Sequence, residues 1–286
     1  MQARGKNLLF MGFLAGSIIL YLSPLRSLFR FAWGSETFSY IPVVPLVGAY
    51  LFYESRKEIF AAGDRWHPAG AVPVVLAIVL YAIGAGQADR LALPNYLALM
   101  TLSFLSLLVG GLGVFYGVEA WKAARFPIFF LIFTAPIPEA LLDRIVVFLQ
   151  SWSAEVANVF FGLTGVPVYR DGFLFQLPGL TIEVAKECSG IRSSIALFLV
   201  SLLAGHLMLR QTWRKTVLTL SIVPITIVKN AVRIVTLSLL AVYVDPRILG
   251  SVAHRRGGFP IFVLALVLLG CVLALLRRGE KKEGEK

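Results

Sequence analysis

One of the two cysteines of the chain stands in a short polar segment directly before a long apolar run. The segment is Glu187-Cys188-Ser189-Gly190-Ile191-Arg192-Ser193-Ser194, and the apolar run extends from Ile195 to Leu209. A cysteine at a helix N-terminus lies at the positive end of the helix dipole, and an arginine four residues later lies on the same helical face. Both effects favour the thiolate, so Cys188 is a candidate nucleophile. The alternative is that Cys188 packs as a small buried hydrophobic residue.

A polar interruption of a later apolar run supplies further candidate groups. Lys229, Asn230 and Arg233 lie within Ile227-Val228-Lys229-Asn230-Ala231-Val232-Arg233-Ile234, at spacings that let them share one helical face. A charge deep in a membrane is unfavourable unless it faces protein or a wet cavity, so these residues are functional candidates. The alternative is a structural arginine that reaches the lipid headgroups or pairs with a buried carboxylate.

His254 is the candidate general base and acid to act with Cys188. The other two histidines, His67 and His206, fall in a predicted cytoplasmic loop and near the inner end of a predicted span. Gly257-Gly258 follows His254 and allows a close backbone approach. A loop histidine can equally be an ordinary solvated residue.

No group of residues has the spacing of a metal site, and no Walker A or Rossmann glycine pattern occurs. We therefore expect neither a metal ion nor a cofactor.

The composition is that of a membrane protein. Hydrophobic residues make up 58% of the 286 residues, and apolar runs recur from end to end, which excludes a soluble globular protein. The net charge of +11 comes from lysines and arginines in short loops and near the C-terminus. That pattern reports membrane orientation rather than nucleic-acid binding. Cys188 and Cys271 lie far apart in sequence, and we expect both to be free thiols.

We predict an all-α polytopic membrane protein of about eight transmembrane helices, forming one domain over residues 1–286. The predicted spans are approximately 8–25, 40–53, 69–86, 93–118, 126–137, 190–209, 216–243 and 258–276. Residues 141–163 mix polar and apolar side chains, which predicts an amphipathic helix along the membrane interface rather than a span. Turn signals at Asp171-Gly172 and Pro178-Gly179 predict a small extracytoplasmic β-hairpin before Cys188.

An even number of spans puts both termini on one side of the cell membrane. Basic residues near the N-terminus and in the tail 277–286 assign that side to the cytoplasm. Cys188 and His254 then lie at the extracytoplasmic face, and Arg233 lies about 25 Å along its span, near the same face. The catalytic part of the chain is expected at about 164–276. The basic loop 245–257 falls outside, against the positive-inside rule.

Taken together and in this order, these motifs resemble the exosortase/archaeosortase family of polytopic membrane transpeptidase-like enzymes, and the bacterial exosortases more than the archaeosortases. The resemblance covers about 33–262 and rests on the Glu187–Ser193 segment, Asn230-x-x-Arg233, and His254 with Gly257-Gly258. Weaker support comes from Pro136-Ile137-Pro138-Glu139 and residues 165–172. Ser39-Tyr40-Ile41-Pro42 resembles an early family segment without its histidine.

The resemblance implies a catalytic set of Cys188, Arg233 and His254, with supporting or substrate-binding roles for Arg192, Asn230, Ser189 and Gly257. It implies that the substrates are secreted proteins with a C-terminal sorting signal of the PEP-CTERM kind: a short motif, a transmembrane helix and a basic tail. The enzyme would cut this signal through a thioester and pass the protein to water or to an acceptor such as an exopolysaccharide or a lipid. Membrane lipid is the expected surrounding, and no nucleic acid is expected as a partner.

Two other classes of protein fit the same residues. A transporter or flippase would use Lys229, Asn230 and Arg233 to bind an anionic substrate in mid-membrane, and its activity would survive loss of Cys188. A structural subunit of an export assembly would tolerate loss of Cys188 and His254 together.

Overall fold

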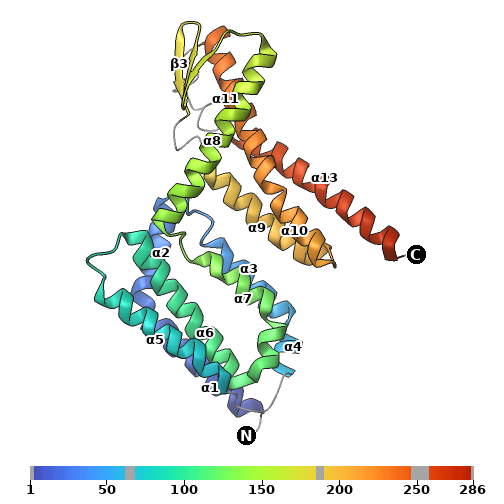
Figure 1. The fold of residues 1–286 in the computed structure, drawn as a ribbon. Coiled ribbons are helices and arrows are strands. Elements are labelled where there is room, and N and C mark those ends of the chain that lie inside the picture. The colour runs from blue at the N-terminus through green and yellow to red at the C-terminus, as the bar shows by residue number, and fades with distance from the viewer. Residues whose placement is uncertain (1–2, 62–67, 185–189, 246–257, 285–286) are drawn as a thin grey trace. The chain divides into compact units, whose positions relative to one another are not determined.

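The computed structural model describes residues 3–61, 68–184, 190–245 and 258–284 of the chain (Figure 1). The chain divides into two compact units, 1–142 and 143–286. Helices form nearly all of the first unit, and the second unit adds one small sheet to its helices.

The first unit is built from helices of very different lengths. They are α1 (Ala3–Leu20), α2 (Leu22–Gly34), α3 (Val43–Glu54), α4 (Arg56–Ala61), α5 (Ala71–Gly86), α6 (Leu93–Ala123) and α7 (Arg125–Leu131), with short 3₁₀ turns η1 (Pro68–Gly70) and η2 (Ile132–Thr134). α1 and α2 meet at a bend of 64°. Pro24 explains the bend, because proline lacks the N–H that would bond to the Leu20 carbonyl and its ring crowds that carbonyl.

Glycines let the helices of the first unit approach closely. A Cβ added at Gly110 of α6 would lie 2.5 Å from Val74 of α5, and one added at Gly48 of α3 would lie 2.5 Å from Leu131 of α7. A polar connection joins α5 and α6 to the bend between α1 and α2, since the Tyr21 hydroxyl lies 2.5 Å from Ser103 Oγ, which donates to the Ala77 carbonyl at 2.6 Å.

The second unit contains long helices and a three-stranded sheet. The helices are α8 (Glu139–Thr164), α9 (Ile191–Met208), α10 (Thr212–Leu220), α11 (Ile222–Tyr243) and α13 (Gly258–Gly284), and the strands are β1 (Tyr169–Asp171), β2 (Leu174–Leu177) and β3 (Leu180–Glu183). The tail predicted at 277–286 continues α13 as far as Gly284, and Cys271 is an exposed free thiol on this helix.

The sheet is an antiparallel meander in the order β1-β2-β3. The predicted turns are confirmed, because Gly172 and Gly179 connect the strands with φ of 58° and 75°, a backbone conformation that glycine adopts without strain. The sheet has one strand more than the predicted two-stranded hairpin. β3 pairs with β2 from Leu180 to Glu183, because Pro178-Gly179 closes a second turn.

The sheet packs against α8 and α11. Its inward residues Phe175 and Leu177 join Ala157 and Phe161 of α8 and Ala231 of α11 in one buried cluster. The rings of Phe161 and Phe175 lie 5.4 Å apart. Figure 1 shows the strands beside the ends of these two helices.

The structure does not confirm eight spans. In the described part of the chain, six helices are long and apolar enough to cross a membrane, or seven if the bent pair of α1 and α2 counts as one span. The predicted spans 40–53 and 126–137 correspond to helices of 12 and 7 residues, α3 and α7, which are shorter than the roughly 20 residues that a membrane requires. α8, predicted to lie along the interface, has 26 residues and passes the same test.

Candidate functional site

Three of the seven predicted site residues lie in the described part of the chain: Arg192 at the start of α9, and Asn230 and Arg233 on α11. Cys188, Ser189, His254 and Gly257 lie outside the described residues. After the predicted nucleophile, the structure describes the chain again from Gly190 onward.

Gly190 forms a tight turn at the start of α9. It is the N-cap residue, with φ of 71° and ψ of 17°, which is left-handed backbone. Its carbonyl accepts hydrogen bonds from Ser194 N at 3.0 Å, Ser194 Oγ at 2.8 Å and Ser193 Oγ at 2.9 Å. α9 thus begins only at Ile191. The predicted i, i+4 relationship between Cys188 and Arg192 involves a residue outside the described part of the chain, and Arg192 itself lies in the first turn of α9.

A buried lysine of α11 supports this turn. Lys229 is only 4% exposed, and its Nζ donates a hydrogen bond to Ser193 Oγ. Since Ser193 in turn donates to the Gly190 carbonyl, a chain of hydrogen bonds runs from Lys229 through Ser193 to Gly190. The sequence singled out Lys229, but nothing in the spacing of one helix could have shown its partner on another.

Asn230 lies directly against the same turn. A Cβ built on Gly190 would lie 3.4 Å from Asn230 Oδ1 and 3.6 Å from Lys229 Nζ. The Asn230 side chain is 2% exposed, and its Nδ2 has no hydrogen-bond partner among the described residues. The predicted grouping of Lys229 and Asn230 on one side of α11 is thus seen at the contact with Gly190.

The two arginines differ in their surroundings. Arg233 is half-buried one helical turn beyond Lys229, whereas Arg192 is exposed on α9. Arg233 therefore lies about 6 Å along α11 from Lys229, the residue that bonds to Ser193.

The segment carrying Cys188 is also anchored on its N-terminal side. Val184 is 1% exposed; its N–H donates to the Phe173 carbonyl at 2.9 Å, and its carbonyl accepts from Gln150 Nε2 of α8. Sequence reasoning missed Gln150 as a positioning residue. Gln150 is an amide among the leucines and valines of 141–163. This mixture of polar and apolar residues suggested an interface helix rather than a buried contact.

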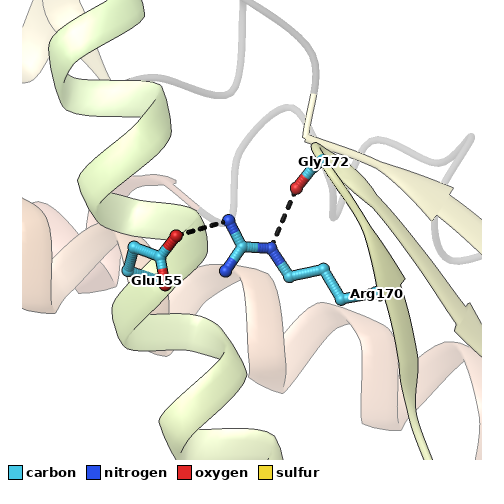
Figure 2. Close-up of polar contacts among 3 residues, drawn as sticks. All are labelled: Glu155, Arg170 and Gly172. Carbon is cyan, nitrogen blue, oxygen red and sulfur yellow. Dashed lines mark hydrogen bonds and ion pairs between the residues drawn. The ribbon is translucent and has the colours of Figure 1, made fainter.

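An ion pair holds the first turn of the sheet to α8, as Figure 2 shows. Arg170 Nη2 lies 2.9 Å from Glu155 Oε1, and Arg170 Nε donates to the Gly172 carbonyl at 2.8 Å. Because Arg170 bonds both the helix and the β1–β2 turn, it fixes how the sheet meets α8.

At the opposite end of α9, a carboxylate and a buried arginine make the hydrogen bonds. The Glu280 carboxylate of α13 accepts from the backbone N–H groups of Arg210 and Gln211 at 3.0 and 2.7 Å. Arg214, 3% exposed, donates to Gln211 Oε1 at 2.6 Å and to the Leu276 carbonyl. These bonds join the end of α13 to the α9–α10 connection.

Within the described residues, no group of three histidine, cysteine or carboxylate side chains is arranged to hold a metal ion. The described polar groups around Gly190 are hydroxyl, amide, ammonium and guanidinium groups. Such a set donates hydrogen bonds and stabilises negative charge.

Fold and site together describe a multi-pass helical membrane protein with a cationic, donor-rich face at the start of one span. The family model of the transmembrane exosortases matches residues 33–271, and the chain belongs to that family. Searches of curated proteins and of solved structures give no match.

Proposed function

We propose that the protein is a membrane cysteine peptidase or transpeptidase that cuts the C-terminal sorting signal of secreted proteins through a thioester. The observation that carries the proposal is the contact between the Gly190 turn and the α11 face with Lys229 and Asn230. This contact supports a site in which the residues just before Gly190 work beside α11.

Chain connectivity limits how far Cys188 can lie from Gly190. Consecutive Cα atoms are 3.8 Å apart, so the Cα of Cys188 lies no more than about 7.6 Å from that of Gly190 in any conformation. Val184, buried against Phe173 and Gln150, bounds the same segment from the other side. These limits support a nucleophile at position 188 that works beside the α11 face carrying Asn230.

The charges of the second unit support an extracytoplasmic site. α9 has 18 residues, or about 27 Å, close to the thickness of about 30 Å of a bilayer's hydrocarbon core. Its far end lies by Arg210, Arg214 and the basic end of α13. The positive-inside rule then assigns that end and the C-terminus to the cytoplasm, and the Gly190 end to the outer face of the cell membrane. Only the charges of the second unit support this proposed orientation, so it does not depend on the number of spans in the first unit.

The proposed reaction is acyl transfer. The Cys188 thiolate attacks the carbonyl carbon at the recognition motif, Arg233 stabilises the thiolate or the oxyanion, and His254 protonates the leaving amine. The product is a thioester between the secreted protein and Cys188. An acceptor amine or hydroxyl, deprotonated by His254, then takes the protein, and water in that role would make the enzyme a protease.

The transporter interpretation requires Lys229 to meet an anionic substrate. Lys229 is 4% exposed, and its ammonium group donates to Ser193 Oγ. A lysine engaged with its own chain supports a turn better than it binds a transported anion, which favours the enzyme.

The test is to co-express the protein with a secreted reporter that carries a candidate sorting signal and to follow the mass of the reporter. We expect the tail to be lost with wild type and to remain with Cys188→Ala. The mass of the new C-terminus distinguishes hydrolysis from transfer. Equal cleavage by Cys188→Ala would overturn the proposal and favour a transporter or scaffold.

A further inference from the structure

Asn230 holds a hydrogen-bond donor that the described chain leaves unpaired. Its side chain is 2% exposed, yet Nδ2 meets no acceptor among the residues that the structure describes. Buried polar groups in folded proteins are nearly always paired, so each unpaired one requires an explanation. A donor kept for a ligand or substrate is one such explanation.

The amide that carries the unpaired donor lies beside the start of a helix. Its oxygen, Asn230 Oδ1, lies 3.4 Å from the position of a Cβ on Gly190, the N-cap residue of α9, and Nδ2 belongs to the same amide. The first backbone N–H groups of any helix have no partner within the helix, and they carry partial positive charge. The Asn230 amide and the first turn of α9 are thus neighbours, and each carries hydrogen-bond donors.

Hydrogen bonds from other residues hold this arrangement in place. Lys229 donates to Ser193, and Ser193 and Ser194 both donate to the Gly190 carbonyl. Lys229 is therefore used in fixing the turn, whereas the Asn230 amide lies beside the turn with its donor still available. Donors that need no rearrangement at the moment of reaction are the ones that stabilise a developing charge most strongly.

We propose that Asn230 Nδ2 donates a hydrogen bond to the carbonyl oxygen of the peptide bond that the enzyme cuts, and so stabilises the oxyanion. This inference rests on the proposed function. When the Cys188 thiolate attacks, a C–S bond forms and the π electrons of the carbonyl move onto its oxygen. Collapse of the intermediate restores the C=O bond and breaks the C–N bond, and the amine leaves with a proton from His254. Asn230 makes no covalent bond, and Arg233 then acts on the thiolate.

The experiment uses the full-length protein in lipid nanodiscs with a synthetic sorting-signal peptide that includes its transmembrane helix. Asn230→Leu keeps the side-chain shape and removes the donor. We expect kcat to fall about 100-fold or more, with KM within about threefold of wild type. The rate of Cys188 alkylation and the Tm should stay unchanged, because the donor has no described partner to lose.

Thr226→Val is the matched control. Thr226 lies one turn earlier on α11, is 1% exposed, and its Oγ1 also has no partner among the described residues. It does not contact the Gly190 turn in any described interaction, so kcat should remain at the wild-type value. If Asn230→Leu does not fold, Asn230→Ser removes the same amide in a smaller side chain.

Each remaining outcome overturns a different statement. If Cys188→Ala is inactive but Asn230→Leu retains kcat within about threefold, the oxyanion role is wrong and the cysteine enzyme stands. If Asn230→Leu lowers Tm, or slows Cys188 alkylation by the same factor as kcat, Asn230 belongs to the packing of the turn. If Cys188→Ala cleaves at the wild-type rate, the proposed function fails and this inference fails with it.

Discussion

Lys229 of α11 donates a hydrogen bond to Ser193 of α9, and this contact joins the two helices at the turn before the predicted nucleophile. Both partners lie on spans that the sequence identifies, 36 positions apart in the chain. The bond explains how a lysine that is 4% exposed can stay inside a membrane protein, because its charge meets a hydroxyl oxygen.

Removing the Ser193 hydroxyl should therefore destabilise the protein. Ser193→Ala leaves the Lys229 ammonium without this acceptor, and breaking a buried hydrogen bond to a charged group costs about 1–3 kcal/mol. Thermal unfolding in detergent measures the effect. Adding Lys229→Met to Ser193→Ala should recover part of the loss, since the buried charge goes with its partner. Strictly additive effects of the two substitutions would show that the contact does not couple them.

Gly190→Ala should strain the turn. The φ of 71° is left-handed, a conformation that costs an L-residue roughly 1–2 kcal/mol. The new Cβ itself would lie 3.4 Å from Asn230 Oδ1, an ordinary contact, so the backbone carries the cost. Gly190→Asn should be milder, because asparagine tolerates this conformation best. Gly270→Ala, a glycine of α13 with open space around it, is the control and should leave Tm unchanged or raised. Equal Tm values for Gly190→Ala and the control would contradict the strained turn.

The features that could be predicted from the sequence are those that depend on a single helix or turn. Periodicity and turn residues located the long spans and both turns of the sheet, because Gly172 and Gly179 are needed wherever the backbone is left-handed. Length misled at two points. The apolar residues 40–53 and 126–137 form short helices that pack on each other, as at Gly48 and Leu131. α8 buries Gln150 against Val184, while its charged residues stay exposed.

For the candidate site, the sequence offered a set of residues, which stays a prediction, and could not offer their geometry. Asn230 and Arg233 stood out because polar groups interrupt an apolar run. The bonds from Lys229 to Ser193 and from Gln150 to Val184 join different elements, so no spacing within one element could show them. The predicted start of the span at Gly190 agrees with the structure, where Ser193 and Ser194 donate to the Gly190 carbonyl and α9 begins at Ile191.

Arg233→Lys should cause a severe loss of processing. Lysine keeps the positive charge but loses the planar fork of donors that guanidinium offers to a thiolate or oxyanion. Reporter cleavage in cells, normalised to the amount of protein in the membrane, measures the effect. Arg192→Lys is the matched comparison, because Arg192 is exposed on α9, and it should retain much more activity. Near-normal processing by Arg233→Lys would assign Arg233 to structure.

The proposed orientation can be tested by single-cysteine labelling in a variant that lacks both native cysteines. Asp171→Cys lies on β1, in the sheet that packs on α8 and α11, and should react with a membrane-impermeant maleimide in intact cells. Gln211→Cys lies at the α9–α10 connection beside Glu280 and should react only after the membrane is opened. α9 separates the two levels by about 27 Å, so one reagent distinguishes them. Labelling of Gln211→Cys in intact cells, with Asp171→Cys protected, would reverse the orientation and place the Gly190 turn at the cytoplasmic face, where a secreted substrate could not reach it after export.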